Sequence, residues 1–303
     1  MILKATSLGA TMYMPALRED IVDAAKGRTV PGLRSLVICL EDAVNESDVP
    51  AALSQLRRTL QGLKMAGQRD TAVFIRPRNA EMLARLSQFR GIEVVDGYVL
   101  PKVTPNSFPV WMEALRTDGH KIMPTIETAE AFDQSEMRRL RDQMQAVADR
   151  VLAIRIGGND LLSTLGARRS RHRTVHEGPL GTVIAMLAGT FIPYGFAMSS
   201  PVLEVVSDMD LLRREVEQDL EQGLLTKTAI HPAQVQVIQE MYRVDPDDYA
   251  DATAILDEEA RAVFKSHGAM CEPQTHRAWA AQIIERASIY GIRDDGIETL
   301  RVA

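Results

Sequence analysis

The segment from Ala153 to Gly166, AIRIGGNDLLSTLG, ends an apolar run with two glycines and then an acid, Asp160. Glycines at such a point suggest a phosphate-binding turn, in which backbone N–H groups face an anion. The segment has neither the G-x-G-x-x-G nor the G-x-x-x-x-G-K-S/T pattern, and the Asp160 carboxylate would repel a phosphate. A carboxylate on this turn would instead attract a metal ion.

The chain contains eight short β-like runs, and each is followed by a helical pattern. Asp160 stands just after the sixth of these runs. They recur at roughly 25 to 40 residues, the length of one βα unit, and eight such units are what a TIM barrel requires. We therefore predict an α/β fold, a (β/α)8 barrel. The runs are Thr11–Pro15, Ser35–Leu40, Ala72–Pro77, Gly97–Lys102, Lys121–Ile126, Val151–Ile156, Tyr194–Ser199 and Thr226–Pro232.

The residues that end these runs are rich in charge. In a TIM barrel the chemistry lies at the C-terminal ends of the strands, so we expect their side chains to meet at one mouth. Crowded like charges are unfavourable unless a divalent cation offsets them, and two carboxylates with waters and substrate oxygens are a usual magnesium arrangement. The predicted cofactor is Mg²⁺, and the charged residues are Glu41, Asp42, Arg76, Lys102, Glu127 and Asp160.

The helical segments between the runs have apolar residues on one face, as in Glu81–Gly91 and Asp210–Gly223, which both end on glycine. From about Asp245 the pattern changes to a turn and a long helix that reaches Met270. A second helix follows from Thr275, a plausible N-cap, to a C-cap at Gly291. We predict a barrel domain over residues 1–244 and a helical extension over residues 245–303, which could serve as a lid or an oligomer contact.

The composition is that of a globular protein, with 46% hydrophobic and 25% charged residues. The net charge of -6 argues against nucleic-acid binding, which needs a basic surface. Two cysteines, Cys39 and Cys271, cannot form a disulfide framework, so a reducing cytoplasm is the expected location. The N-terminal residues predict no signal peptide, and no segment is apolar enough to predict a membrane span.

Six motifs together resemble a known family. ICLEDAV, FIRPRN, YVLPKV, PTIETAEAF, GGNDLLSTLG and AIHPAQV occur between about Met12 and Gln236. They stand in the order found in the citrate lyase β-subunit and malyl-CoA lyase group of the HpcH/HpaI aldolase–citrate lyase superfamily. The chain resembles a divergent member of this group. The resemblance implies a TIM barrel, magnesium-dependent carbon–carbon lyase chemistry and a homo-oligomer, a trimer or hexamer.

The resemblance also assigns roles to residues at the predicted mouth. Glu127 and Asp160 would be the protein ligands of the metal. Arg76 would bind a substrate carboxylate or carbonyl oxygen, and Glu41 and Asp42 would organise water on the metal and the far side of the site. The substrate would also meet the strand-end residues Lys102, Gly157, Gly158 and Asn159.

Some relatives complete the site with an acid from the C-terminal extension of a neighbouring subunit, in a segment close to G-x-x-x-D-x-P. The matching stretch here is GAMCEP, which places Glu272 where the acid stands. A lyase of this kind must move a proton on the alcohol or the enolate carbon. Glu272 or a metal-bound water is the candidate for that general acid/base role.

The chain departs from the family pattern after the sixth predicted strand. The family usually has a recognisable helix at that point, whereas this chain has the stretch GARRSRHRTVHEGPLG. In the seventh strand region the sequence GFAMSSPVLEVVSD is not typical of the family. The basic cluster in the first stretch favours a solvated loop, although it could meet the phosphates of CoA or of a phosphorylated substrate. The substrate pocket is therefore expected to differ from that of the relatives.

The predicted function is that of a metal-dependent carbon–carbon lyase. It would cleave or condense a small hydroxy or keto acid, or its acyl-CoA-type thioester, through an enolate that the metal stabilises. Three alternatives stay open. The same site could hydrolyse a thioester, Lys102 could form a Schiff base, or the chain could be a non-catalytic ligand-binding subunit of a larger assembly.

Overall fold

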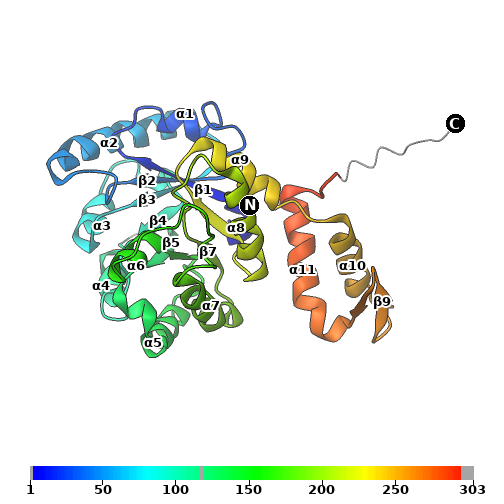
Figure 1. The fold of residues 1–303 in the computed structure, drawn as a ribbon. Coiled ribbons are helices and arrows are strands. Elements are labelled where there is room, and N and C mark those ends of the chain that lie inside the picture. The colour runs from blue at the N-terminus through cyan, green and yellow to red at the C-terminus, as the bar shows by residue number, and fades with distance from the viewer. Residues whose placement is uncertain (1–2, 117–118, 295–303) are drawn as a thin grey trace. The chain divides into compact units, whose positions relative to one another are not determined.

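The computed structural model describes residues 3–116 and 119–294 of the chain. Eight parallel strands pair in sequence order, and β1 pairs with β8 to close a barrel (Figure 1). This confirms the predicted TIM barrel. The strands are β1 Ala10–Pro15, β2 Ser35–Cys39, β3 Ala72–Arg76, β4 Gly97–Leu100, β5 Lys121–Ile126, β6 Ile154–Ile156, β7 Met198–Ser200 and β8 Thr226–Ala229.

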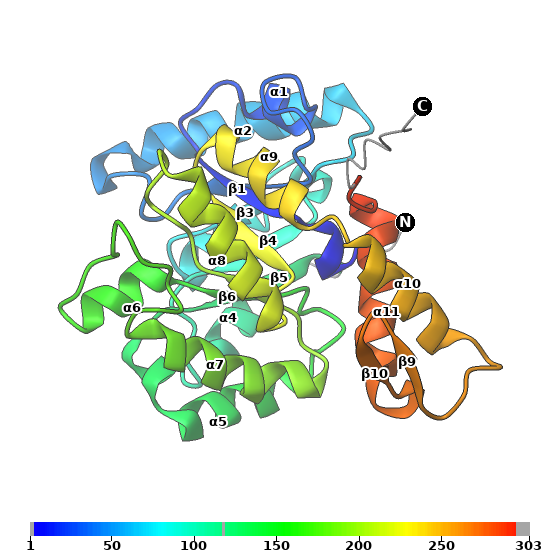
Figure 2. The same ribbon diagram turned by 45° about the vertical axis from the view of Figure 1, so that its right-hand side comes forward.

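Helices surround the strands (Figure 2), and each buries an apolar stripe against them. In α2, for example, Leu53, Leu56, Leu60 and Leu63 recur at helical spacing and are buried. Short 3₁₀ turns join several elements. The helices of this part are α1 Ile21–Ala25, α2 Val49–Ala66, α3 Ala80–Leu86, α4 Phe108–Ala114, α5 Gln134–Gln145, α6 Gly158–Thr164, α7 Leu180–Phe191, α8 Met209–Glu221 and α9 Pro232–Met241.

The barrel interior changes character along the strands. Toward their N-terminal ends it is filled by an apolar cluster that includes Val37, Phe74, Val99 and Met123. Side chains two residues apart on a strand point to the same face, so Arg76 follows Phe74 on the inner face of β3. The C-terminal half of the interior is thus polar and rests on a packed apolar floor.

The chain divides into two compact units, residues 1–238 and 239–303. The described part of the second unit contains α10 Pro246–Leu256, the strands β9 Phe264–Ser266 and β10 Ala269–Cys271, and α11 Pro273–Tyr290. It has its own apolar cluster, in which α10 and α11 meet through Ala252, Ile255, Ala280 and Ile283. Residues 295–303 of the predicted extension lie outside the described residues.

The prediction of one long helix up to Met270 was wrong. The α10 helix ends at Leu256, and β9 and β10 form an antiparallel hairpin. The two residues between these strands, His267 and Gly268, have φ angles of 42° and 83°. Positive φ at both central positions is what a two-residue hairpin turn of type I′ requires.

Two further boundaries differ from the sequence predictions. A 3₁₀ turn covers Ile192–Tyr194, so β7 begins only at Met198. The N-cap position of α11 is Glu272 and not Thr275. In the described part of the chain, no helix combines the length and apolar character needed to cross a bilayer.

Candidate active site

A cavity of about 410 Å³ lies at the C-terminal ends of the barrel strands. Its walls come from the inner face and the strand ends of β1, β2, β3, β5, β6 and β8. Seven of the residues predicted from the sequence line it, namely Asp42, Arg76, Glu127, Gly157, Gly158, Asn159 and Asp160. The strand-end acids and the arginine therefore do converge.

Arg76 is the centre of an ion-pair cluster. Its Nη2 atom lies 2.9 Å from Glu41 Oε2 and 2.9 Å from Glu127 Oε1, and its Nη1 atom lies 3.3 Å from Asp42 Oδ2. Burial alone would lower the pKa of Arg76, but the surrounding acids raise it. The guanidinium is thus a permanent positive charge, held in one orientation by acids from two loops.

Glu127, the residue after β5, is held by two donors. Arg76 is one, and the backbone N–H of Lys102 is the other, at 2.8 Å from Oε1. Lys102 adopts a φ of 51°. The left-handed conformation is uncommon for a residue with a side chain, and here it accompanies the N–H that reaches the Glu127 carboxylate.

The glycine pair of the opening segment has a steric role. A Cβ atom on Gly157 would overlap the Glu127 carboxylate, and one on Gly158 would lie 2.8 Å from Pro201 Cβ. Gly157 therefore lets the Glu127 carboxylate lie against the backbone where β6 ends. The α6 helix starts immediately afterwards and carries Asp160 in its first turn.

Glu127 and Asp160 lie in different environments within the same cavity. Burial raises the pKa of Glu127 to about 7, and Asp160 adds to this increase while Arg76 opposes it. Asp160 is half-buried. Among the described residues its carboxylate has neither an ion pair nor a hydrogen bond. These two acids repel each other, and a cation between them would relieve that repulsion.

The donor set fits magnesium better than zinc. The described ranges contain no group of three or more His, Cys, Asp or Glu residues that could hold a metal ion. Structural and catalytic zinc sites use three or four nitrogen, sulfur or carboxylate ligands. Magnesium is commonly held by only one or two carboxylates, with waters and substrate oxygens completing its shell. Glu127 and Asp160 supply such a pair.

Lys102 and Glu41 lie at the cluster but do not line the cavity. Lys102 Nζ is 2.6 Å from Glu41 Oε1 and 3.6 Å from Asp42 Oδ1. Partial burial lowers the pKa of the Lys102 amine, but these acids raise it above its usual range. A protonated amine is not a nucleophile, which argues against the Schiff-base alternative.

Among the cavity residues that the sequence analysis did not assign to the site are four with hydroxyl or guanidinium groups, namely Tyr13, Thr125, Arg155 and Thr228. All four lie inside strands, whereas the residues predicted from the sequence stand at or just beyond the strand ends. Arg155 did carry a signal, because it is a single charge in the middle of an apolar run. Such a residue in a parallel strand that is buried on both faces needs an explanation.

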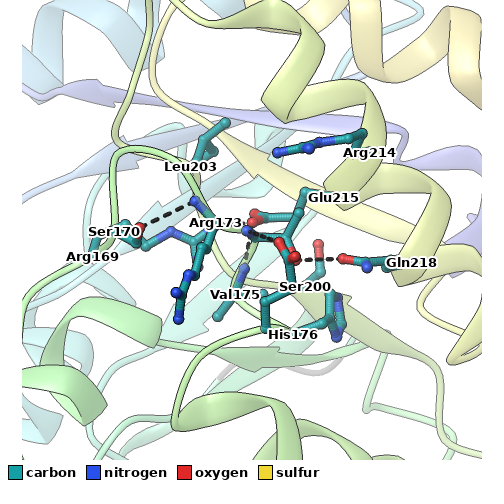
Figure 3. A network of polar contacts seen from close by, with 12 residues as sticks. Arg169, Ser170, Arg173, Val175, His176, Ser200, Leu203, Arg214, Glu215 and Gln218 are labelled. Carbon is teal, nitrogen blue, oxygen red and sulfur yellow. Dashed lines mark hydrogen bonds and ion pairs between the residues drawn. The ribbon is translucent and has the colours of Figure 1, made fainter.

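The loop after α6 is fastened to α8 by a buried polar network outside the cavity (Figure 3). Arg169 forms an ion pair with Glu215, and His176 Nε2 lies 2.8 Å from Asp219 Oδ1. Lys227 of β8 is fully buried, with Nζ 2.9 Å from Glu215 Oε1 and 2.8 Å from Asp219 Oδ2.

This network changes the interpretation of the basic cluster. Arg169 and His176 point inward and have acidic partners, so the loop is not simply solvated and neither residue is available to a phosphate. Exposed members of the cluster remain, and these are Arg168, Arg171, His172 and Arg173.

Glu272 belongs to the second compact unit. It precedes α11, and its Oε2 atom accepts a hydrogen bond from Thr275 Oγ1 at 3.2 Å. Its part in the chemistry of the cavity stays a prediction.

Comparison with known proteins gives relatives with two different descriptions. The chain is similar to a (3S)-malyl-CoA thioesterase of Cereibacter sphaeroides, with 26% identity over 238 residues and 78% of each chain covered. It is similar to a citrate lyase subunit beta-like protein of Mycobacterium tuberculosis, with 25% identity over 276 residues, 86% of this chain and 89% of the relative.

Among solved structures, it resembles the protein CitE from Mycobacterium tuberculosis, which was crystallised with magnesium, acetoacetate and coenzyme A. The TM-score is 0.67 at 23% identity, with 94% of this chain and 99% of that chain covered. These likenesses confirm the resemblance to the citrate lyase β-subunit group and the fold.

A protein-family profile matches nearly the whole chain, from residue 2 to residue 292, and it describes carbon–carbon bond lyases of the TIM-barrel fold. The match includes every strand of the barrel and the three acids that line the cavity, Asp42, Glu127 and Asp160. The chain belongs to this family of carbon–carbon bond lyases.

Proposed function

We propose that this protein is a magnesium-dependent lyase that cleaves or forms a carbon–carbon bond in a small hydroxy or keto acid, or in its thioester. The observation that carries the proposal is the pair Glu127 and Asp160, two neighbouring acids in one cavity beside a fixed arginine. The family assignment and the magnesium complex of the Mycobacterium tuberculosis neighbour support it.

Glu127 and Asp160 would hold the Mg²⁺ ion. When bound, magnesium supplies Lewis-acid stabilisation to the negative charge that develops on a substrate oxygen as the bond breaks. Burial of Glu127 serves this chemistry, since water that would compete for the charge is excluded from its side of the cavity.

Arg76 would orient the substrate. Its Nη atoms are fixed by three carboxylates, while its Nε atom is buried without a hydrogen-bond partner in the described ranges. An N–H donor on a rigid guanidinium suits a carboxylate or carbonyl oxygen. Glu41 and Asp42 act on the substrate indirectly, because they hold this guanidinium in place.

A general acid/base must move a proton on the alcohol or on the carbon of the leaving fragment. We assign this role to Glu272, from the same subunit or from a neighbour in a homo-oligomer, a trimer or hexamer. Within the described residues the carboxyl group of Glu272 has one partner, the Thr275 hydroxyl, and no cation is paired with it, which suits a group that accepts and returns a proton. The two buried, unpaired cysteines are compatible with a reducing cytoplasmic location.

Thioester hydrolysis is the second candidate function, and the Cereibacter sphaeroides relative, described as a thioesterase, favours it. The same cavity would then activate water against an acyl thioester, and a free acid would form without any new or broken carbon–carbon bond. Product analysis separates the two reactions.

The first test is magnesium binding by isothermal titration calorimetry, with and without pyruvate or oxaloacetate. We expect binding that the keto acid tightens and that Glu127→Ala and Asp160→Ala each abolish. The matched control is Glu217→Ala, an exposed acid on α8, which should bind as the intact protein does. If the intact protein binds no magnesium under either condition, the proposal is wrong, and a ligand-binding subunit becomes the better interpretation.

A further inference from the structure

Arg155 is a buried cation in the floor of the cavity. It is the central residue of β6, only 1% exposed, and it lines the cavity. Its side chain crosses the barrel interior, where Nη2 donates to Thr228 Oγ1 at 2.6 Å and Nη1 to Thr11 Oγ1 at 3.4 Å.

No acid compensates this charge within residues 3–116 and 119–294. Arg76, on the same inner surface, has three carboxylate partners. Within the described residues the partners of Arg155 are uncharged, namely two hydroxyls, the Sδ atom of Met123 at 3.7 Å and the ring of Tyr13, whose centroid lies 5.3 Å from Cζ. Burial of a charge without a counter-charge is strongly unfavourable. An anionic ligand would remove that penalty.

Unpartnered hydroxyl groups flank Arg155 on both sides. In the sheet register Thr125 of β5 and Ser199 of β7 lie directly beside it. Ser200 donates to Asp219 on the outer α8 helix, so by alternation Ser199 faces the interior. Thr125 Oγ1, Ser199 Oγ and Arg155 Nε are all buried, and none has a partner in the described structure. Buried polar atoms normally do have partners.

The distance along β6 between Arg155 and the acid pair suits a substrate with a second carboxylate. Arg155 precedes Gly157 by two residues on β6, so a rise of about 3.3 Å per residue sets their Cα atoms about 7 Å apart along the strand. Gly157 touches the Glu127 carboxylate. A short dicarboxylic acid can span such a distance, with one end at the acid pair and the other at the floor.

We propose that Arg155, with Thr125 beside it in the cavity wall, forms an anion subsite that receives a second carboxylate of the substrate, at the end remote from Glu127 and Asp160. This inference rests on the proposed function and narrows its substrate class to dicarboxylic hydroxy or keto acids. Arg155 is a specificity-determining residue in this scheme and takes no part in bond cleavage.

The test compares two keto acids that differ by one carboxylate. Dissociation constants are measured by calorimetry for freshly prepared oxaloacetate and for pyruvate, both with magnesium. The intact protein should bind oxaloacetate at least about tenfold more tightly, since a hydrogen-bonded charge pair contributes that much. In Arg155→Met this preference should fall to within about twofold, while pyruvate binding changes little. Arg155→Lys should retain part of the preference.

Arg85→Met is the matched control, because Arg85 is exposed on α3; it should keep the full preference. Equal binding of the two acids by the intact protein overturns the subsite even if the Arg155 variants do not fold, and so does an unchanged preference in Arg155→Met. Either result leaves the proposed function standing, because pyruvate still binds with magnesium. Failure of both acids to bind with magnesium overturns the proposed function and the subsite together.

Discussion

At the scale of single residues, Glu127 combines burial, a neighbouring acid and a fixed cation. Burial raises its pKa to about 7 from an ordinary value of 4.5. Because the folded-state pKa is the higher one, its contribution to stability is fully present below about pH 4.5 and is lost as the pH rises through about 7. The protein thus keeps a carboxylate that is partly protonated at neutral pH, and a metal ion must displace that proton.

Magnesium affinity should therefore depend on pH. Between about pH 5 and 7 the dissociation constant should fall by up to about tenfold per pH unit, because one proton leaves Glu127 on binding, and it should level off above about pH 8. Calorimetry in buffers of different ionisation enthalpy measures the released proton directly. Affinity that does not change between these pH values would show that Glu127 is ionised before magnesium arrives.

A second prediction concerns Gly157. Its φ of -87° is accessible to alanine, so Gly157→Ala tests the overlap with Glu127 alone. We expect a loss of about 1–3 kcal/mol in unfolding free energy and at least tenfold weaker magnesium binding. The control is Gly189→Ala on α7, where a Cβ meets no atom within 4 Å and should stabilise the helix by up to about 1 kcal/mol. Urea denaturation and titration measure both effects, and equal behaviour of the two variants would contradict the steric role.

How far the sequence predicts the site depends on where each residue lies. Arg76, Glu127 and Asp160 stand at strand ends, and the βα rhythm alone brings them to one mouth. Arg155 and Tyr13 lie inside strands that are buried on both faces. Such strands have nearly continuous apolar runs, so the sequence does not distinguish a residue that faces the cavity from one that faces a helix.

At the scale of elements, the buried network of Figure 3 ties a long loop to α8 and β8. Glu215 is the residue that joins its parts. It pairs with Arg169 and Lys227 and accepts the Val175 backbone N–H at 2.7 Å. The loop after α6 therefore has a defined path, although its sequence is basic and suggested a solvated segment.

Loss of Lys227 should destabilise the protein strongly. Lys227→Met leaves Glu215 and Asp219 fully buried with less positive charge around them, and breaking such a buried pair costs about 3–5 kcal/mol. The comparison is Lys64→Met, which removes the partner of Glu93 in an exposed ion pair and should leave the urea midpoint unchanged. Similar midpoints for the two variants would contradict a structural role for the network.

The elements themselves were predictable to different degrees. Most strands of the barrel were recognised from short apolar runs, because a βα repeat constrains their spacing. The β7 strand was misplaced since its apolar start, Tyr194, belongs to a 3₁₀ turn. The inward direction of Arg169 depends on Glu215 and Asp219, two acids one helical turn apart on the buried face of α8. Only the three-dimensional pairing brings these distant segments together.

At the scale of the whole molecule, the chain consists of a barrel unit and a smaller unit with its own core. The change of pattern near Asp245 led to the predicted extension over residues 245–303, whereas the second compact unit starts at residue 239. The β9–β10 hairpin did not show in the sequence as a strand pair. Short strands of three residues carry too few side chains for a clear alternation. Glu272, the acid to which we assign proton transfer, follows that hairpin directly and precedes α11.

We expect Glu272 to act as the general acid/base, either in its own subunit or in a neighbouring one. With a substrate identified by product analysis, Glu272→Gln should lower kcat by about 10²- to 10⁴-fold and leave magnesium and keto-acid binding intact. The control Glu258→Gln, an exposed acid of the same unit, should keep full activity.

A mixing experiment then distinguishes the two arrangements. Glu272→Gln and the inactive Glu127→Ala are unfolded together and allowed to reassemble. If Glu272 reaches a neighbouring subunit of a homo-oligomer, roughly a quarter of the sites regain both intact residues and activity returns. If it serves its own subunit, no activity returns, and an undiminished kcat in Glu272→Gln would exclude the role in either arrangement.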